Sequence, residues 1–272
     1  MVYRGLKKTV FMVYFPGAAE CDFSARHELL PRRFSIGGQQ DFRIIMKSSI
    51  YFVSGIDTDI GKSIATGMMA RHLYRAGRRV ITLKLVQTGN TGFSEDIARH
   101  REIMGCGLFP EDGERLTAPE IYSFPASPHL AAEIDGRPID LEKILRAVRL
   151  LCERYEIVLV EGAGGLAVPL TEDLLTVDFA SRQNWPLILV TSGRLGSLNH
   201  TILSLEAAAV RKMKISGVVY NESPKADPMI EKDSERMIRR YLRQAGQPEV
   251  LVRLPEVKAP DWGDVDFSPI FR

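Results

Sequence analysis

The residues best suited to chemistry form a glycine-rich turn that carries a lysine and a serine. Gly61, Lys62 and Ser63 follow an apolar segment at 50–53 and precede spaced apolar residues over 64–76. This order predicts a strand, a loop and a helix. At the start of such a helix, free backbone N–H groups, the lysine charge and the serine hydroxyl suit phosphate and Mg²⁺. We therefore predict a loop that binds a nucleoside triphosphate.

The loop departs from the usual spacing of such motifs. Five residues, 56–60, separate Gly55 from Gly61, whereas the pattern G-x-x-x-x-G-K-[ST] has four at that point. A helix that happens to begin with Gly-Lys-Ser would carry the same residues without binding a nucleotide. Residues elsewhere in the chain have to decide between these two interpretations.

Three ionisable residues stand where ligands bind in open α/β proteins. Lys84 lies at the carboxyl end of the second predicted strand, Asp96 follows it, and Glu161 ends the apolar run 157–160. Ser63, Asp96 and Glu161 would supply oxygen ligands to Mg²⁺. The alternatives are a lysine that extends to solvent and a glutamate that caps a turn. A glutamate after four buried apolar residues needs a partner, and a cation is the simplest one.

The elements that must position these residues alternate along the chain. This alternation predicts an α/β, P-loop NTPase-like single domain with a mostly parallel sheet and helices on both faces. The predicted strands are 50–54, 79–84, 156–161, 186–191, 215–220 and 249–252. The predicted helices are 62–76, 95–104, 140–154, 174–184, 199–211 and 228–244. Residues 105–139, rich in Gly and Pro, predict an irregular excursion over the top of the sheet.

Composition excludes several classes of protein. The 272 residues are 45% hydrophobic with a formal charge of +2, so nucleic acid and anionic membranes are not the expected partners. No apolar run approaches the length that spans a bilayer. The three cysteines, Cys21, Cys106 and Cys152, are far apart and indicate neither a zinc site nor a disulfide framework. A reducing, cytoplasmic setting is the expectation.

Residues 1–45 differ from the rest of the chain in charge balance and in residue pattern. They hold seven Lys and Arg against four Asp and Glu, which leaves 29 basic and 30 acidic residues in 46–272. The acidic residues argue against a transit peptide, and the apolar stretch 9–17 is short for a secretory signal. We expect 46–272 to form the functional domain, with Met46 as the natural first residue and 1–45 as a dispensable extension.

The order of several segments resembles one enzyme family, the ATP-dependent dethiobiotin synthetases. The segments are Gly-x-Asp-Thr-x-x-Gly-Lys-Ser at 55–63, Lys-Leu-Val-Gln-Thr-Gly at 84–89, Ser-Pro-His at 127–129, Val-Glu-Gly-Ala-Gly-Gly at 160–165 and Gly-Arg-Leu-Gly-Ser-Leu-Asn-His at 193–200. The resemblance covers about residues 49–256. It also accounts for the extra loop residue, which is typical of this family.

The resemblance implies a ligase of biotin biosynthesis that uses ATP and Mg²⁺. Its substrates would be 7,8-diaminopelargonate (7,8-diaminononanoate) and CO2, and its products dethiobiotin, ADP and phosphate. By similarity, the phosphates lie on Asp59, Ile60, Gly61, Lys62, Ser63 and Ile64, and both ligands approach Glu161, Gly162, Ala163 and Gly164. Lys62 and Lys84 would be the catalytic cations, Ser63, Asp96 and Glu161 the metal ligands, and Thr88 a substrate contact.

The resemblance also places the nucleotide base and the second subunit. Adenine would contact Asn221, with Glu222 beside it, and a later loop of Leu254, Pro255 and Glu256. The substrate carboxylate would bind to a helix start that the partner subunit contributes, formed by Gly196, Ser197, Leu198 and Asn199. The active site would therefore lie at a homodimer interface. His129 and His200 are expected to be hydrogen-bonding or interface residues, because no nucleophile or metal-ligand spacing surrounds them.

Several residues depart from the commonest family pattern. Ile56, Asp59, Ser63 and Leu85 replace threonine, glutamate, threonine and proline. The role of Asp59 is the least secure, since its side chain is one methylene shorter than glutamate.

A ParA/MinD-like ATPase switch protein is an alternative function that would share the fold. It would carry a second lysine early in the loop and usually a basic surface or amphipathic tail, which this sequence lacks. A related amide-forming synthetase would normally append a glutamine-hydrolysing domain, for which the chain has no room.

Overall fold

The strands of this protein are short apolar segments that pair at the centre of the fold. The computed structural model describes residues 48–272. The extension 1–45 and the start predicted at Met46 therefore lie outside the described residues. Within that part of the chain, strands and helices alternate as the sequence predicts.

Ten strands and a series of helices make up the described part of the chain. The strands are β1 Ser49–Gly55, β2 Val80–Lys84, β3 Gln87–Thr88, β4 Ile121–Tyr122, β5 Ile157–Gly165, β6 Pro169–Thr171, β7 Leu174–Leu175, β8 Leu187–Ser192, β9 Ile215–Asn221 and β10 Leu251–Leu254. The helices are α1 Lys62–Arg75, α2 Glu95–Met104, α3 Pro110–Gly113, α4 Pro128–Ile134, α5 Leu141–Arg154, α6 Thr176–Arg182, α7 Ser197–Val210, α8 Pro228–Gln244 and the 3₁₀ helix η2 Ser268–Phe271.

One six-stranded sheet carries the fold, in the order β10-β9-β8-β1-β5-β2. All neighbouring strands in it are parallel. Residues 157–160 of β5 are buried, as are the apolar residues 187–190 of β8, because helices cover both faces of the sheet. Parallel pairing brings the carboxyl ends of β1, β2 and β5 to one edge, where Lys84 and Glu161 are register partners.

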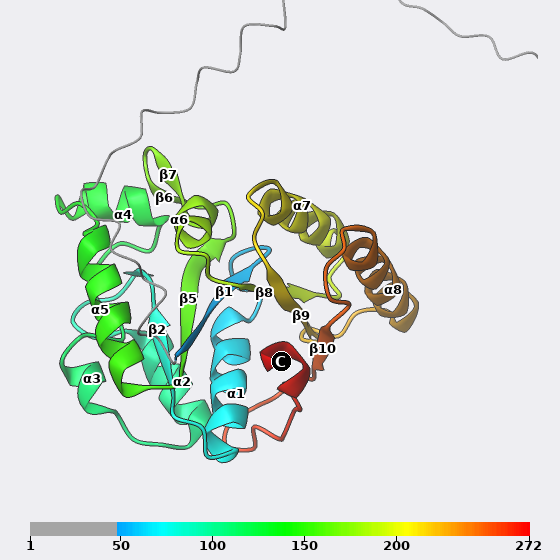
Figure 1. Ribbon diagram of the computed structural model, residues 1–272, viewed down its shortest axis with the longest axis horizontal. Helices are drawn as coiled ribbons and strands as arrows, with labels where there is room; N and C mark the ends of the chain where they lie inside the picture. The colour runs from blue at the N-terminus through cyan, green and yellow to red at the C-terminus, as the bar shows by residue number, and fades with distance from the viewer. Residues whose placement is uncertain (1–47) are drawn as a thin grey trace, which may run out of the picture. The chain divides into compact units, whose positions relative to one another are not determined.

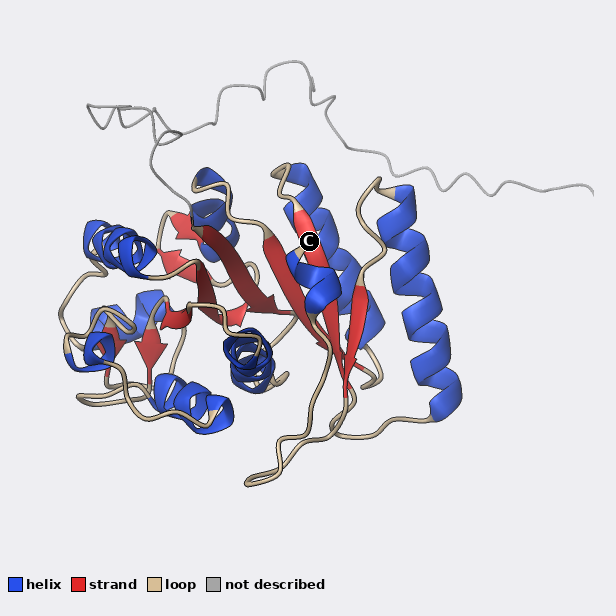
Figure 2. Ribbon diagram, turned by 60° about the horizontal axis from the view of Figure 1, so that its bottom comes forward, coloured by secondary structure: helices blue, strands red, loops and turns tan. Residues whose placement is uncertain are grey.

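Helices lie on both faces of this sheet. Figure 1 shows α6, α7 and α8 on one side and α1 with η2 on the other. Helix α1 packs against β1, β2 and β5 and runs beside α2, whereas α5 contacts β5 and α7 contacts β8. Figure 2, turned from this view, shows the strands enclosed between helices. The fold is therefore the predicted α/β arrangement, and within residues 48–272 no helix has the length and apolar character needed to cross a bilayer.

The predicted elements are confirmed, with boundaries that differ by a few residues. The exception is 105–139, which is less irregular than predicted. It contains the short helices α3 and α4 and the strand β4, which pairs in parallel with β3. A strand of two residues and helices of four and seven residues are too short to show a strand or helical period, so the pattern of apolar residues did not reveal them.

Candidate active site

The loop between β1 and α1 is built to present backbone N–H groups. Asp59 and Gly61 have φ angles of 54° and 91°, in the left-handed region, and a Cβ at Gly61 would collide with the side-chain amide of Asn221. Among the described residues, no side chain caps the start of α1, and its first turn contains no acidic residue. The first N–H groups of α1 are therefore free to bind an anion.

Lys62 brings a buried positive charge to this loop. Its side chain is 7% exposed, and its Nζ donates to the carbonyl oxygen of Asp57 at 2.8 Å. Burial, together with the nearby charge of Lys84, lowers the pKa of Lys62 to about 8. A buried cation held by a carbonyl oxygen gains much from an anionic ligand. A bound phosphate group would provide that ligand.

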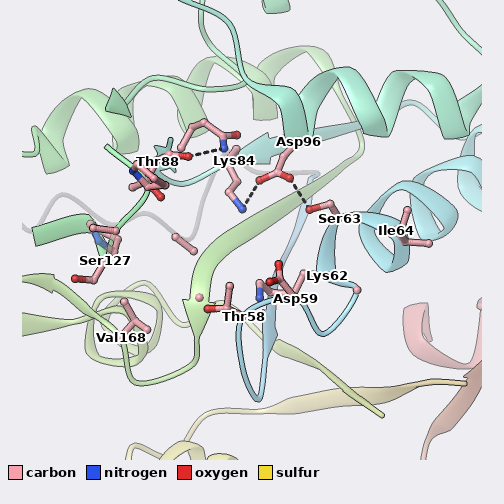
Figure 3. A pocket seen from close by; sticks show the side chains of 17 residues that line it. Thr58, Asp59, Lys62, Ser63, Ile64, Lys84, Thr88, Asp96, Ser127 and Val168 are labelled. Atoms are coloured by element: carbon pink, nitrogen blue, oxygen red, sulfur yellow. Dashed lines mark hydrogen bonds and ion pairs between the residues drawn. The ribbon is translucent and has the colours of Figure 1, made fainter. Parts of the chain in front are cut away.

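Four polar side chains converge beside the loop, as Figure 3 shows for Lys84, Asp96 and Ser63. Ser63 Oγ lies 2.6 Å from Asp96 Oδ1 and 2.9 Å from Glu161 Oε1. Lys84 Nζ lies 2.6 Å from Asp96 Oδ2 and 2.8 Å from Glu161 Oε1, and it also donates to the carbonyl oxygen of Gly162 at 3.1 Å. The sequence predicted each of these residues, and the fold brings them together.

This cluster has the donor atoms that Mg²⁺ prefers. The Ser63 hydroxyl has one hydrogen but two carboxylate partners, so one of those contacts lacks a proton between its oxygens. A hard cation would satisfy all three oxygens. Residues 48–272 contain no group of three or more His, Cys, Asp and Glu side chains suited to a metal ion. A cation here would therefore depend on two carboxylates, one hydroxyl and the oxygens of a bound phosphate, as is usual for Mg²⁺.

The pKa values of Lys84 and Glu161 follow from the way the charged groups of the cluster pair with one another. Burial alone would lower the pKa of Lys84, but Glu161 and Asp96 outweigh it and raise that pKa. Burial alone would raise the pKa of Glu161, yet Lys84 and His100 hold it well below its usual range. The site therefore combines a firmly protonated lysine, which can stabilise negative charge on a substrate, with an ionised glutamate, which can bind a cation.

A cavity of about 700 Å³ lies above these residues. Thr58, Asp59, Gly61, Lys62, Ser63 and Ile64 line it from the loop, together with Lys84, Gln87, Thr88, Asp96, Pro125, Ala126, Ser127, Pro128, Ala163, Gly164 and Val168. Thr88, the predicted substrate contact, thus lines the same cavity as the phosphate loop. Gln87 and Val168 were missed, since neither residue type indicates chemistry by itself. The volume suits a phosphate chain and a second small substrate side by side.

Three of the five predicted base-contacting residues lie at a second cavity. Asn221 Nδ2 donates to the Ile60 carbonyl oxygen at 3.0 Å, so Asn221 also braces the phosphate loop. Glu222 forms an ion pair with Arg253, and its N–H donates to the Leu254 carbonyl oxygen at 2.9 Å. Glu222, Pro255 and Glu256 line a cavity of about 560 Å³, which does not include Leu254.

The predicted carboxylate-binding helix start is separate from both cavities. Gly196, Ser197, Leu198 and Asn199 open α7 but do not line the 700 Å³ cavity of the same chain. Ser197 is buried and bonds Ser192 at 3.0 Å, whereas Asn199 is exposed. The neighbouring Leu195 is 85% exposed.

The two histidines that sequence analysis set aside stay outside the cluster. His200 is exposed. His129 lines a different cavity of about 340 Å³. The histidine that does reach the cluster, His100, was missed. Its spacing of four residues from Asp96, on one face of α2, was the available signal.

The fold and the site define a nucleotide-binding α/β protein of the phosphate-loop class. Residues 49–262 match a family model described as "AAA domain". The chain is 46% identical over 197 residues to "ATP-dependent dethiobiotin synthetase BioD 2" of Pasteurella multocida (strain Pm70), covering 72% of this chain and 92% of that protein. It is 48% identical over 195 residues to the protein of the same name from Haemophilus ducreyi (strain 35000HP / ATCC 700724), with the same coverages of 72% and 92%.

The chain belongs to the ATP-dependent dethiobiotin synthetase family. A third relative, from Chlorobaculum tepidum, is 46% identical over 208 residues, covering 76% of this chain and 87% of that protein. Among solved structures, a ParA family ATPase from Chlorobium tepidum TLS has 16% identity and a TM-score of 0.47, covering 78% of this chain and 86% of that one. A similarity at that level carries no argument about function.

Proposed function

We propose that this protein is an ATP-dependent ligase of biotin biosynthesis that converts 7,8-diaminopelargonate and CO2 into dethiobiotin. ATP is consumed to ADP and phosphate. The observation that carries this proposal is the single cavity that holds the phosphate loop, Lys84 and Thr88. A nucleotide and a diamine bound there would have their reacting atoms adjacent, which removes most of the entropic cost of bringing them together.

The reaction has three bond-forming steps. One amine attacks CO2 and loses a proton, giving a carbamate. A carbamate oxygen then attacks the γ-phosphorus of ATP, which gives a mixed carbamic–phosphoric anhydride and releases ADP. The second amine attacks the carbonyl carbon, loses a proton and expels phosphate, which closes the cyclic urea. No residue of the chain has to form a covalent bond in these steps, so catalysis rests on positioning and on charge.

The two buried lysines supply that charge. Lys62, at the start of α1, would exchange its bond to the Asp57 carbonyl oxygen for the transferred phosphoryl group. Lys84 is held by Asp96 and Glu161, so its ammonium is fixed before the substrate arrives. A fixed cation avoids the reorganisation that a flexible lysine would require as the carbamate and the anhydride gain negative charge.

Ser63, Asp96 and Glu161 would hold Mg²⁺ against the nucleotide. When bound, the ion would neutralise phosphate charge and orient the γ-phosphate. The support from this structure is the oxygen-only donor set, in which one hydroxyl hydrogen is shared between two carboxylates. Asn221 would contact adenine while its amide braces Ile60, and Glu222, Leu254, Pro255 and Glu256 would surround the base.

The substrate carboxylate would bind to α7 of a second subunit. Among the described residues, no side chain caps the start of α7 and its first turn contains no acidic residue, so its N–H groups suit an anion. This helix start lies outside the cavity of its own chain, beside the exposed Leu195. Both features fit an active site shared across a homodimer.

The activity test measures ADP release with ATP, Mg²⁺ and bicarbonate, with and without 7,8-diaminopelargonate. We expect diamine-dependent ADP release and a product with the mass of dethiobiotin. A rate of ATP hydrolysis that is the same with and without the diamine would refute the proposal and favour an ATPase switch protein. Residues 1–45 are proposed to be dispensable in this assay.

The shared site can be tested by mixing two variants. Lys62→Ala damages the phosphate loop, and Asn199→Asp places a negative charge where the substrate carboxylate would bind. If each site uses the loop of one subunit and α7 of the other, a randomly exchanged mixture regains about a quarter of the wild-type activity, because half the dimers carry one intact site of two. Activity no higher than the mean of the two separate variants would rule out the shared site.

A further inference from the structure

His100 is sealed beneath the carboxylate cluster. Its side chain is 0% exposed, with Nε2 2.9 Å from Glu161 Oε2 and Nδ1 3.0 Å from Thr82 Oγ1. It touches neither the cavity nor the surface, so it is not placed to contact a substrate. Its contacts instead connect the glutamate to the second strand of the sheet.

The spacing of residues on two elements produces this arrangement. On β2, Thr82 and Lys84 are two residues apart and point to the same face. On α2, Asp96 and His100 are four residues apart and lie on one face. Lys84 pairs with Asp96, and Thr82 pairs with His100, so two contacts stack along one helix–strand interface. Glu161, on the neighbouring strand β5, touches both layers.

The hydrogen bond between His100 and Glu161 has a direction that the surrounding groups fix. Arg101 Nη1 donates to Thr82 Oγ1 at 2.9 Å, and an arginine can only donate. Thr82 therefore uses one lone pair toward Arg101, and either its hydrogen or its second lone pair can pair with His100 Nδ1. The ionised Glu161 can only accept, so its contact must receive the hydrogen of His100 Nε2. A ring with a hydrogen on Nε2 satisfies both contacts.

Arg101 is itself fixed, which anchors the whole chain of bonds. Its Nε and Nη2 donate to the two oxygens of Asp112 at 2.9 and 2.7 Å, and both residues are buried. Asp112 Oδ1 also accepts from Thr117 Oγ1 at 2.7 Å. A bidentate arginine pair has little freedom to rotate, so it holds the Thr82 hydroxyl in one orientation.

We propose that His100 is a positioning residue for Glu161 and selects which of its two oxygens faces the bound cation. The Nε2–H of His100 occupies Oε2, which leaves Oε1 directed at Ser63 and Lys84. Glu161 is thereby held as a one-oxygen ligand. This inference rests on the proposed role of Glu161 in binding Mg²⁺. Residues that orient metal ligands in this way are typically worth 10- to 100-fold in metal affinity.

Two substitutions separate the hydrogen bond from the packing. His100→Leu fills the buried space without a donor, whereas His100→Gln keeps an N–H donor near the position of Nε2. His72→Leu is a matched control, because His72 lies on α1 with its side chain 23% exposed and pairs with Asp266, away from the cluster. Circular dichroism and thermal unfolding establish that each variant is folded.

The main readout is the Mg²⁺ dependence of ADP binding, measured by calorimetry rather than by turnover. We expect His100→Leu to raise the apparent Mg²⁺ dissociation constant by about 10- to 100-fold, and His100→Gln to change it by less than about threefold. An unchanged Mg²⁺ dependence in folded His100→Leu would overturn the inference. If the wild-type protein itself shows no Mg²⁺ dependence, the proposed metal site fails and the inference fails with it.

A second readout needs no metal ion. Long-range ¹H–¹⁵N spectra of the wild-type protein report the tautomer of each of the five histidines, and the signals lost in His100→Gln identify His100. We expect a ring with a hydrogen on Nε2. A ring with its hydrogen on Nδ1 could not donate to Glu161 and would overturn the inference.

Discussion

Replacing the loop lysine by methionine should stabilise the nucleotide-free protein while removing its ability to use ATP. Lys62 is buried with a pKa of about 8, against an ordinary value of 10.5. The fold therefore disfavours the charged form, at a cost of about 3 kcal/mol at pH 7. Lys62→Met removes that cost but also removes the bond to the Asp57 carbonyl oxygen, worth about 1 kcal/mol. The expected net gain is about 2 kcal/mol.

The gain must depend on pH in a defined direction. The pKa is lower in the folded state, so the unfolded chain binds more protons between pH 8 and 10.5, and the wild-type protein recovers stability as the pH rises through that window. Lys62→Met has no such group. The gain in stability of Lys62→Met over wild type should therefore be complete at pH 7. It should shrink to about zero near pH 10, where the cost of burying Lys62 in the wild-type protein is below about 1 kcal/mol.

Thermal unfolding at pH 7 and pH 10 provides the test. For a domain of this size, about 2 kcal/mol corresponds to a rise in Tm of about 4–8 °C at pH 7. Lys232→Met, at an exposed position of α8, is the control and should give no such pH-dependent difference. Two results would show that burial of this charge is not costly: a Lys62→Met protein less stable than wild type, or one whose gain in stability is the same at pH 7 and pH 10. The variant should also lose the stabilisation that Mg²⁺ and ADP give the wild-type protein.

Three further predictions concern the cluster, the loop and the extension. Lys84→Ala should lower kcat by about 10² or more and destabilise the protein by about 3–5 kcal/mol, because Asp96 and Glu161 lose a buried cation; steady-state kinetics and denaturant unfolding measure the two effects. Gly61→Ala should weaken ADP binding by at least about tenfold, since φ is 91° and the added methyl meets the Asn221 amide; calorimetric affinity equal to wild type would contradict this. A protein beginning at Met46 should keep its diamine-dependent ADP release, and a folded but inactive truncated protein would refute the proposed domain boundary.

Local sequence was sufficient for the elements and for several residues of the site. Runs such as 157–160 and 187–190 are apolar throughout, and only a strand buried on both faces accounts for them at that length. Lys84 and Glu161 could be placed together because parallel strands end at the same edge of a sheet. The short elements within 105–139 escaped prediction, since β4 exists through its pairing with β3 rather than through its own pattern.

The sequence by itself therefore determined the alternation of strands and helices, the phosphate loop and the identity of the charged residues. Only the tertiary structure decided how those residues pair. Glu161 meets Ser63, Lys84 and His100 across separations of 98, 77 and 61 residues, and Asn221 meets Ile60 across 161. The physical reason is that periodicity and motif spacing describe neighbours within an element. Hydrogen-bond partners in a buried cluster are instead chosen by how the elements pack.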